Sequence, residues 1–491
     1  MLNWLKKLRR PYSKPQIAAR WDGAQTTTNN VNSWLYADNM SATAAANEEV
    51  LRTLRARSRY EFQENNSYGK GMVLALANFT IGTGPRLEIN LPDSAVDEII
   101  EAEFARWMKA TRLAEKLRTS RIAKAVDGDV FLVQSNNSKL PTPVQLDYRL
   151  IEAEQCSTPD QHQEIDERFE VDGIRFDLAG NPIFYNFLKH HPGAESIDFT
   201  DDYMSVPSEK VVHLFRQDRP GQRRGIPETA PALPLMPILR RYTLATLEAA
   251  TSAAYWMAII HTDAPADAGP AQIQDGDFAA FDLARNAAMS LPEGWKASQM
   301  KPEHPTTTYG DFKKEILEEI ARCLEIPFNI ASGNSSDYNF ASGRLDWQSF
   351  FRAIEVERTY YEKTALEPIF YAWLDEALLI PGYLPPLGDF RDVPHAWHWD
   401  GFPVVDPTKE ANAAVSLHAA GLLDEDAYWQ EKGLSVEEAH RRMARAKESR
   451  EANGLNASPQ SEPQQQEADN EEEAQEPEET STSQSASGES N

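Results

Sequence analysis

The chain has 491 residues, a formal net charge of −27 and 41% hydrophobic residues, with 11 Trp, 16 Tyr and 20 Phe. This composition excludes a chain that is disordered throughout, and the length predicts two to four domains or one elaborate one. Two cysteines, Cys156 and Cys323, exclude a disulfide scaffold and a cysteine-rich metal centre. No secretory signal and no run of about 18 apolar residues is found, so we expect a soluble intracellular protein without a membrane partner.

The charge is unevenly distributed along the chain. Residues 1–20 contribute +6 and residues 451–491 contribute −11, so the body between them carries −22. An acidic body argues against a broad basic footprint for nucleic acid. Residues 451–491, rich in Glu, Gln, Ser and Pro, are predicted to be disordered. They are either a solubilising tail or an acidic arm that repels DNA or binds a basic partner.

The N-terminal half is predicted to begin with helices. A charged helix over 47–60 and an apolar helix through about Phe79 precede a turn at 82–84 and a strand from Arg86. A further helix is expected over 93–117, with 122–126 as a short continuation. Its predicted core positions are Ile99, Phe104, Trp107 and Leu113. The Gly pairs at 69/71 and 82/84 match no phosphate-binding pattern.

Strands are predicted in the next part of the chain, over 130–134, 144–150 and 210–215, with a meander over 169–187. Asp127, Asp129 and Asp147 could form a carboxylate or metal site. Asp-Gly-Asp is also common in tight turns, and turn chemistry is the interpretation we favour.

A basic loop follows the last of these strands. It holds four arginines within nine residues, namely Arg216, Arg219, Arg223 and Arg224. These side chains could contact phosphate or pair with acids of a neighbouring chain, and we favour the pairing.

The C-terminal half is predicted to be mainly helical. Long helices are expected over 235–260, 309–326 and 341–377, the last kinked at Pro368. An acidic loop-rich segment, 263–300, separates the first two, and a polar loop, 329–339, precedes the third. Two more helices are expected over 407–420 and 435–449.

No residue pattern here predicts catalysis. His395 and His398 have H-x-x-H spacing, but a metal would need a third ligand, and a structural role is favoured. Cys323 lies beside an apolar helical stripe and is expected in the core. No serine sits in a nucleophile elbow. We therefore predict no enzymatic activity, no metal and no cofactor.

Four segments together resemble the portal proteins of tailed double-stranded DNA phages, lambda type. They are RARSRYEFQENNSYGKGMV with IGTG (55–84), DGDVFLVQ with VQLDYRL (127–150), VPSEKVVHLFRQDRPGQRRGIP (206–227) and EILEEIARCLEIPFNIASGNSSDYNFASGR (315–344). The resemblance covers roughly 25–450 and leaves out the acidic tail.

The resemblance implies a helix-rich α+β portal fold that assembles as a ring, usually of twelve copies. It implies a mixed α/β wing, a helical stem, a small α/β clip and a helical crown. The implied segments are a basic N-terminal arm 1–24, wing 25–230, stem helix 231–262, clip 263–308, second stem helix 309–326, tunnel loop 327–340, kinked helix and return to the wing 341–404, crown 405–450 and acidic tail 451–491.

The resemblance also implies sites and partners. The tunnel loop would line the DNA channel with Ser332, Asn334, Ser335, Ser336, Asp337 and Asn339. The clip would bind the large terminase subunit and head-completion or adaptor proteins through Asp275, Asp277, Asp282 and Glu293. Further partners would be double-stranded DNA passing non-specifically and the major capsid and scaffold proteins. The protein would reside at the capsid portal vertex of the virion, and in the host cytoplasm during assembly.

Two other functions stay open from the sequence. One is a metal-dependent DNA-processing enzyme that uses Asp127, Asp129 and Asp147. The other is a different structural virion component, such as an adaptor.

Overall fold

A computed structural model describes residues 32–35, 37, 39–92, 94–159, 170–194, 202–254, 258–262, 295–299, 308–336, 340–387, 393–402 and 407–453. The chain forms two compact units, residues 1–411 with 431–433, and residues 412–430 with 434–491. The basic arm 1–24 lies outside the described residues.

The first unit begins with helices whose ends are fixed by asparagine caps. After the short α1 (Ala42–Ala45), helix α2 (Glu48–Arg59) starts where the Asn47 side chain accepts a hydrogen bond from the Val50 amide. A π-turn, Tyr60–Glu64, leads to α3 (Ser67–Ile81), which Asn66 caps in the same way. Both helices and the strand β1 (Arg86–Ile89) confirm the sequence prediction.

The helix predicted over 93–117 is two helices, α4 (Ser94–Thr111) and α5 (Leu113–Asp127). Arg112 separates them in a left-handed conformation with φ of 55°. The buried stripe of α4 is Ile100, Phe104 and Trp107, whereas Ile99 is 43% exposed. The choice of Ile99 as a core residue was therefore wrong by one position. Phe104, Trp107 and Leu113 are buried as predicted.

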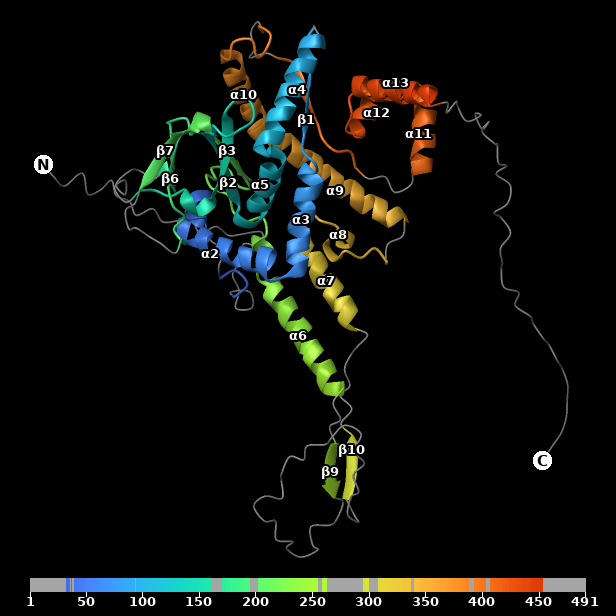
Figure 1. The fold of residues 1–491 in the computed structure, drawn as a ribbon. Coiled ribbons are helices and arrows are strands. Elements are labelled where there is room, and N and C mark those ends of the chain that lie inside the picture. Colours follow the sequence, from blue (N-terminus) through green and yellow to red (C-terminus); the bar gives the residue numbers. More distant parts are fainter. Residues whose placement is uncertain are drawn as a thin grey trace, which may run out of the picture. The chain divides into compact units, whose positions relative to one another are not determined.

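Two small antiparallel sheets pack beside these helices (Figure 1). The first has the order β3-β2-β8, and the second has the order β4-β5-β6-β7. Their bounds are β2 (Asp129–Asn136), β3 (Leu146–Glu152), β4 (Glu170–Val171), β5 (Ile174–Phe176), β6 (Pro182–Leu188), β7 (Tyr203–Pro207) and β8 (Val211–Phe215). The described part of the predicted meander, β4 to β6, turns at Asp172-Gly173 and at Gly180, all with positive φ.

Strand β2 joins two cores because it is buried on both faces. Val130 and Leu132 point into a cluster formed with α4, α5 and the C-terminal helices. Phe131 and Val133 alternate to the other face and pack against Tyr185 and the rest of the second sheet. This strand therefore holds the helical layer and the second sheet together.

The long C-terminal helix of this unit is interrupted before Pro368. Helix α9 (Phe340–Tyr361) passes through a π-turn, Glu362–Leu366, into α10 (Glu367–Leu379). The sequence predicted a kink at Pro368, and the structure places a π-turn directly before it and Pro368 in the first turn of α10. The following strand β11 (His395–His398) returns to pair with β1 and was not predicted.

The predicted helix over 235–260 is shorter. Helix α6 (Leu235–Ala254) ends before strand β9 (Ala258–Thr262), which pairs with β10 (Trp295–Gln299). Ile259, Ile260 and Thr262 are β-branched and favour a strand over a helix. The prediction of a helix was therefore wrong for 258–260, whereas the assignment of 231–262 to a stem stays a prediction. Helix α7 (Thr308–Arg322) also stops short of the predicted Ile326.

The second unit consists of short helices, most of α11 (Pro407–Ala419) and α12 (Glu425–Glu431) and all of α13 (Val436–Ala452). Helix α12 was not predicted. Ser435 caps α13 by accepting a hydrogen bond from the Glu438 amide at 3.2 Å. Among the helices that the structure describes, none is sufficiently long and apolar to span a bilayer.

Candidate functional site

The predicted polar loop 329–339 starts with a short helix. Residues Phe328–Ser332 form α8, in which Asn329 and Ala331 are buried. Pro327 precedes α8 in an extended conformation, and Phe328 and Ile330 pack against the core of α3 and α7. The prediction of a loop from 329 was therefore wrong for residues 329–332, because alternate apolar side chains anchor them.

An exposed segment follows α8 at Gly333–Ser336. The Ser332 hydroxyl donates to the Phe328 carbonyl at 2.8 Å and accepts from the Asn334 amide at 3.2 Å. The Asn334 side chain in turn accepts from the Ser336 amide at 3.0 Å. These local bonds hold a small, uncharged projection between α8 and α9. Asp337 and Asn339 lie outside the described residues.

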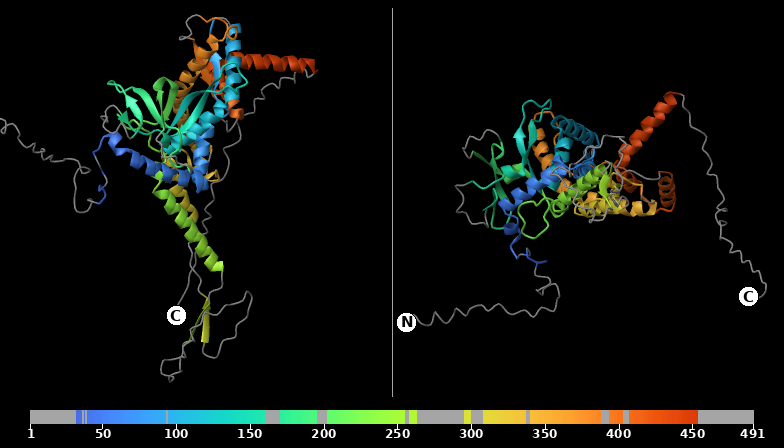
Figure 2. Two further views of the ribbon diagram at one scale, coloured as in Figure 1. Left: turned by 60° about the vertical axis from the view of Figure 1, so that its left-hand side comes forward. Right: turned by 90° about the horizontal axis from the view of Figure 1, so that it is seen from below.

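Helices α6 and α7 form an antiparallel pair beside this segment (Figures 1 and 2). Tyr242 of α6 stacks on Tyr309 with 5.7 Å between the ring centroids, and it packs against the tilted ring of Phe312 at 4.5 Å. At the other end of the pair, α7 contacts the 3₁₀-turn Ala230–Ala232 that precedes α6. The chain between the two helices includes the hairpin of β9 and β10.

Helix α7 separates its charges by face. Lys313 lies over the Tyr68 ring at 4.7 Å, and Lys314 lies over the Phe328 ring at 5.2 Å. The exposed positions are mainly acidic, namely Asp311, Glu315, Glu318 and Glu319, with Arg322 as the one exposed base of the helix. The outward face is therefore negative, because its lysines are turned onto aromatic rings.

The predicted clip residues Asp275, Asp277, Asp282 and Glu293 lie outside the described residues. The described part of this segment is the strand β10, which pairs with β9 in the register Trp295–Thr262 to Gln299–Ala258. Its role stays a prediction.

The basic loop is bound to its own subunit. Gln222, which no sequence pattern indicated, is buried and organises the loop. Its amide nitrogen donates to the carbonyls of Arg216 and Arg224 at 3.1 and 2.9 Å, and its oxygen accepts from the Asp218 amide at 3.0 Å. A glutamine among four arginines gave no charge signal by which to find it.

Arg224 corrects the prediction of an intersubunit or phosphate contact for this residue. Its guanidinium is 2% exposed and pairs with Asp129 at 2.6 Å. It also donates to the carbonyls of Cys156 and Ala153 at 3.0 and 2.7 Å. All of these partners belong to the same chain, so Arg224 anchors the loop.

The other three arginines lie nearer the surface and have intrachain partners too. Arg216 pairs with Asp218 at 2.7 Å, and Arg219 donates to the Met40 carbonyl at 2.9 Å. Arg223 donates to the Gly180 carbonyl at 2.6 Å and lies over the Phe176 ring. Contact with a neighbouring subunit or phosphate stays a prediction for these three.

The three aspartates considered for metal binding are each held by bases. Asp129 is fully buried between Arg55 at 3.0 Å and Arg224 at 2.6 Å. Burial alone would raise the pKa of Asp129, but these two arginines lower it well below its usual range. Asp127 pairs with Arg59 at 2.7 Å, and Asp147 pairs with Lys116. Burial raises the pKa of Asp127 to about 7, against the opposing effect of Arg59. The carboxylates are thus parts of ion pairs.

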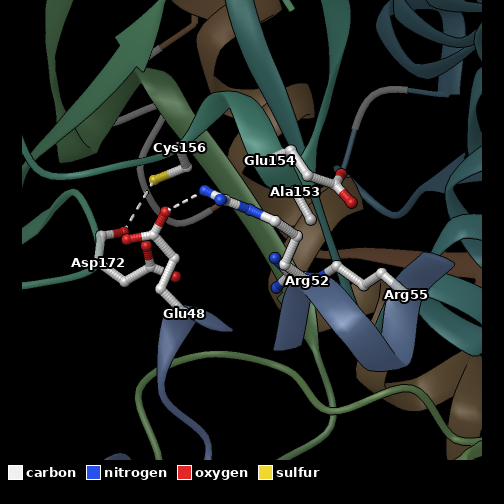
Figure 3. Close-up of a pocket in the computed structure, with 7 residues that line it drawn as sticks. All are labelled: Glu48, Arg52, Arg55, Ala153, Glu154, Cys156 and Asp172. Atoms are coloured by element: carbon white, nitrogen blue, oxygen red, sulfur yellow. Dashed lines mark hydrogen bonds and ion pairs between the residues drawn. The ribbon is translucent and has the colours of Figure 1, made fainter. Parts of the chain in front are cut away.

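A shallow pocket adjoins this ionic network (Figure 3). The Cys156 sulfur faces the Asp172 carbonyl at 3.6 Å, and Arg52 pairs with Glu48. Burial raises the pKa of the Cys156 thiol, which disfavours the reactive thiolate. The pocket therefore lacks an activated nucleophile.

Glu152, Glu154 and His191 bring potential metal ligands within 4.8 Å of one another. Arg59 already lies 2.6 Å from Glu154 and 3.5 Å from Glu152. The Arg59 guanidinium therefore already supplies the positive charge that a metal ion would bring to these two carboxylates.

His395 and His398 do not share a site. They lie three positions apart on strand β11, where His395 contacts Glu367 at 3.0 Å and His398 contacts Glu88. Successive side chains of a strand alternate between its faces, so an odd spacing directs the two rings to opposite sides. The structural interpretation of this pair is supported.

The family described as "Phage portal protein, lambda family" matches residues 28–358 of the 491 residues. The chain belongs to the lambda family of phage portal proteins. The match extends from before α1 to near the end of α9, and it contains the basic loop, the α6–α7 pair and the exposed segment after α8. The protein is therefore a phage portal, a structural virion component that connects head and tail.

Three solved structures are similar to this portal protein. One chain is from the "virion of native gene transfer agent (GTA) particle", with 16% identity over 76% of this chain and 91% of that chain, at a TM-score of 0.41. One from the neck of the empty particle, computed with C6 symmetry, has 14% identity over 78% and 93%, at 0.45. One from the neck of the native particle, computed with C12 symmetry, has 16% identity over 78% and 92%, at 0.43.

Proposed function

We propose that this portal protein assembles into a ring of twelve copies, through whose centre double-stranded DNA passes during packaging and ejection. Membership of the portal family is the observation that carries the proposal. The order of elements supports the proposal. The antiparallel helix pair α6 and α7 is followed by the exposed turn Gly333–Ser336 and then by the long helix α9.

In this proposal α6 and α7 are the stem, and the segment from Gly333 to Asn339 lines the channel. The segment contains one acid, Asp337, and no lysine or arginine. It can therefore approach the DNA backbone without the strong attraction that phosphate contacts by basic residues would add.

The acidic face of α7 has a matching role. Asp311, Glu315 and Glu318 are exposed, whereas Lys313 and Lys314 are held against aromatic rings. A negative wall repels phosphate and keeps a duplex away from the protein surface. Twelve copies would carry a formal charge of about −324, twelve times −27.

The segment 263–308 is proposed as the clip. It would dock the large terminase subunit during filling and the head-completion or adaptor proteins afterwards, with Asp275, Asp277, Asp282 and Glu293 as contacts. We further propose that assembly takes place in the host cytoplasm together with capsid and scaffold proteins.

The portal family is a structural one, and we propose that this chain has no enzymatic activity. The rival nuclease would need Asp127, Asp129 and Asp147 to hold a divalent metal. Asp127 pairs with Arg59, Asp129 pairs with Arg55 and Arg224, and Asp147 pairs with Lys116. These ion pairs oppose the binding of a metal by the three carboxylates. Magnesium-dependent cleavage of duplex DNA by the purified protein would contradict the proposal.

Electron microscopy of the purified protein tests the proposed assembly. We expect rings with a central channel, and the symmetry of their class averages measures the copy number. A monomeric protein, or an oligomer without a channel, would contradict the proposal. An adaptor would also form a ring, so binding of purified large terminase, expected for a portal, distinguishes the two.

A further inference from the structure

The second half of helix α13 is basic in a strongly acidic chain. The segment His440–Arg450 contains Arg441, Arg442, Arg445, Lys447 and Arg450 and a single acid, Glu448, so its formal charge is +4. Every residue from His440 to Asn453 is exposed. This surface lies in the second unit and outside the part of the chain that matches the portal family.

Little within the described residues stabilises this half of the helix. Ala439 is the one buried residue of α13, and Met443 is 47% exposed. A helix exposed on all sides is only marginally stable unless its charges are compensated. Arg442 has a compensating partner in Glu438, but the like charges of Arg445, Lys447 and Arg450 lie within two helical turns of one another, with Glu448 as the one acid among them. An anionic partner would relieve this repulsion.

The chain supplies such a partner directly after α13. Residues 454–491 contain ten acidic residues and no lysine or arginine, with three consecutive acids at Glu471–Glu473. A random-coil chain of this length has an end-to-end distance of about 35 Å, and α13 is about 26 Å long. The tail can therefore reach every basic position of the helix without leaving its own subunit.

We infer that the acidic tail 454–491 binds the basic half of α13 in the same chain. Covalent linkage raises the effective concentration of the tail at this helix to the millimolar range, so weak ion pairs are sufficient for binding. The ion pairs are formed by Arg445, Lys447 and Arg450 with glutamates of the tail. The tail thereby acts as an anion that covers this basic surface and competes with phosphate for it. This inference holds whether or not the protein forms the proposed channel.

Carbodiimide cross-linking of the full-length protein tests the inference, because this reagent joins a lysine amine to a carboxylate in direct contact. Lys447 is the one lysine of α13. Mass spectrometry is expected to find Lys447 linked to tail acids such as Glu471–Glu473. The yield should fall severalfold from about 0.1 M to about 1 M salt, since the Debye length shrinks from about 10 Å to about 3 Å.

Two variants with Lys447 intact provide the matched comparison. In the first, Arg441, Arg442, Arg445 and Arg450 are replaced by glutamine, which keeps the helix propensity. Its yield should fall by about fivefold or more, because the helix loses four positive charges, among them Arg445 and Arg450, which pair with the tail. In the second, Glu437→Gln and Glu448→Gln on the same helix should raise the yield. Equal yields in both variants and the parent would overturn the inference, as would the absence of any link to the tail.

Isotope labelling distinguishes the chain's own tail from that of a neighbour. Unlabelled and ¹⁵N-labelled protein are mixed before assembly and then cross-linked. Links within one chain give peptide pairs of a single isotope, which is the expected result. Mixed pairs would show that the tail comes from another copy and would overturn the inference. Duplex DNA binding by the parent that the glutamine variant loses would assign α13 to nucleic acid instead.

Discussion

The basic loop, through its buried Arg224, and the exposed segment after α8 use charge in opposite ways. In the loop, Arg224 is enclosed with Asp129 and backbone carbonyls, so its positive charge stabilises the subunit's own architecture. At Gly333–Ser336 the chain is exposed and uncharged, and the neighbouring face of α7 is acidic. Arg224 therefore serves the subunit's own structure, and the segment proposed to meet DNA, 333–339, contains no arginine.

The largest effect is expected from removing the buried carboxylate that pairs with the basic loop. Asp129→Ala would remove the carboxylate that the buried Arg55 and Arg224 share, leaving Arg224 with Asp172 alone and Arg55 with no paired carboxylate among the described residues, which should lower the free energy of unfolding by about 3–5 kcal/mol. Urea denaturation with a tryptophan fluorescence readout measures this change. Asp218→Asn, which removes the exposed pair with Arg216, is the control and should cost about 0.5 kcal/mol or less. A similar loss in the free energy of unfolding of both variants would contradict the conclusion that the buried pair stabilises the fold more than the exposed pair does.

The proposed role of the exposed segment after α8 is tested by placing positive charge on it, next to the DNA. Ser335→Lys with Ser336→Lys should leave ring formation and thermal stability unchanged, because both side chains are exposed and neither forms one of the local bonds of this segment. DNA packaging should fall about tenfold or more, since new phosphate contacts retard sliding. The matched pair Ser335→Asp with Ser336→Asp should package nearly normally. Normal packaging by the lysine variant would remove this segment from the channel.

A smaller effect is expected at the proposed clip. Charge reversal by Asp275→Lys with Asp277→Lys should weaken docking of the large terminase subunit by about threefold to tenfold without altering ring assembly. Surface plasmon resonance with immobilised terminase measures it. Asp311→Lys with Glu315→Lys on α7 controls for the overall charge and should dock normally. Equal weakening by both pairs would mean that net charge, not the clip, governs docking.

A pH-dependent effect on stability is expected at Asp127. Its pKa of about 7 in the folded protein lies above the ordinary value of 3.8, so the folded state binds this proton more tightly than the unfolded state. The contribution of Asp127 to stability is therefore lost as pH rises from about 4 to about 7. Relative to Asp127→Asn, the free energy of unfolding of the parent should fall by up to about 4 kcal/mol across this range, because each unit of the shift is worth about 1.4 kcal/mol. Parallel stability curves would contradict this account.

Much of the fold could be predicted from local sequence signals. Asn47 and Asn66 cap helices, and Asp172-Gly173 turns a hairpin. The motifs of the basic loop and of the α7–α9 region are sufficient, as sequence, to indicate the portal family. These features depend on residues close together in the chain.

The errors have a common physical origin in contacts between distant residues. The strand β11 forms because it pairs with β1, about 300 residues earlier, and Arg224 is buried because Asp129 lies beneath it. Ile99 and Ile100 differ only in which one faces α10 and its neighbours. Sequence periodicity gives no access to such pairings, so the arginine loop was assigned to the surface.

The central claim is that the segment after α8 lines a DNA channel, and site-specific photo-cross-linking in stalled, partly filled heads tests it most directly. A benzophenone side chain at Ser335 should cross-link to the packaged DNA. The same group at Leu178, which is 92% exposed in the turn between β5 and β6, should not. Cross-linking at Leu178 but not at Ser335 would contradict the claim.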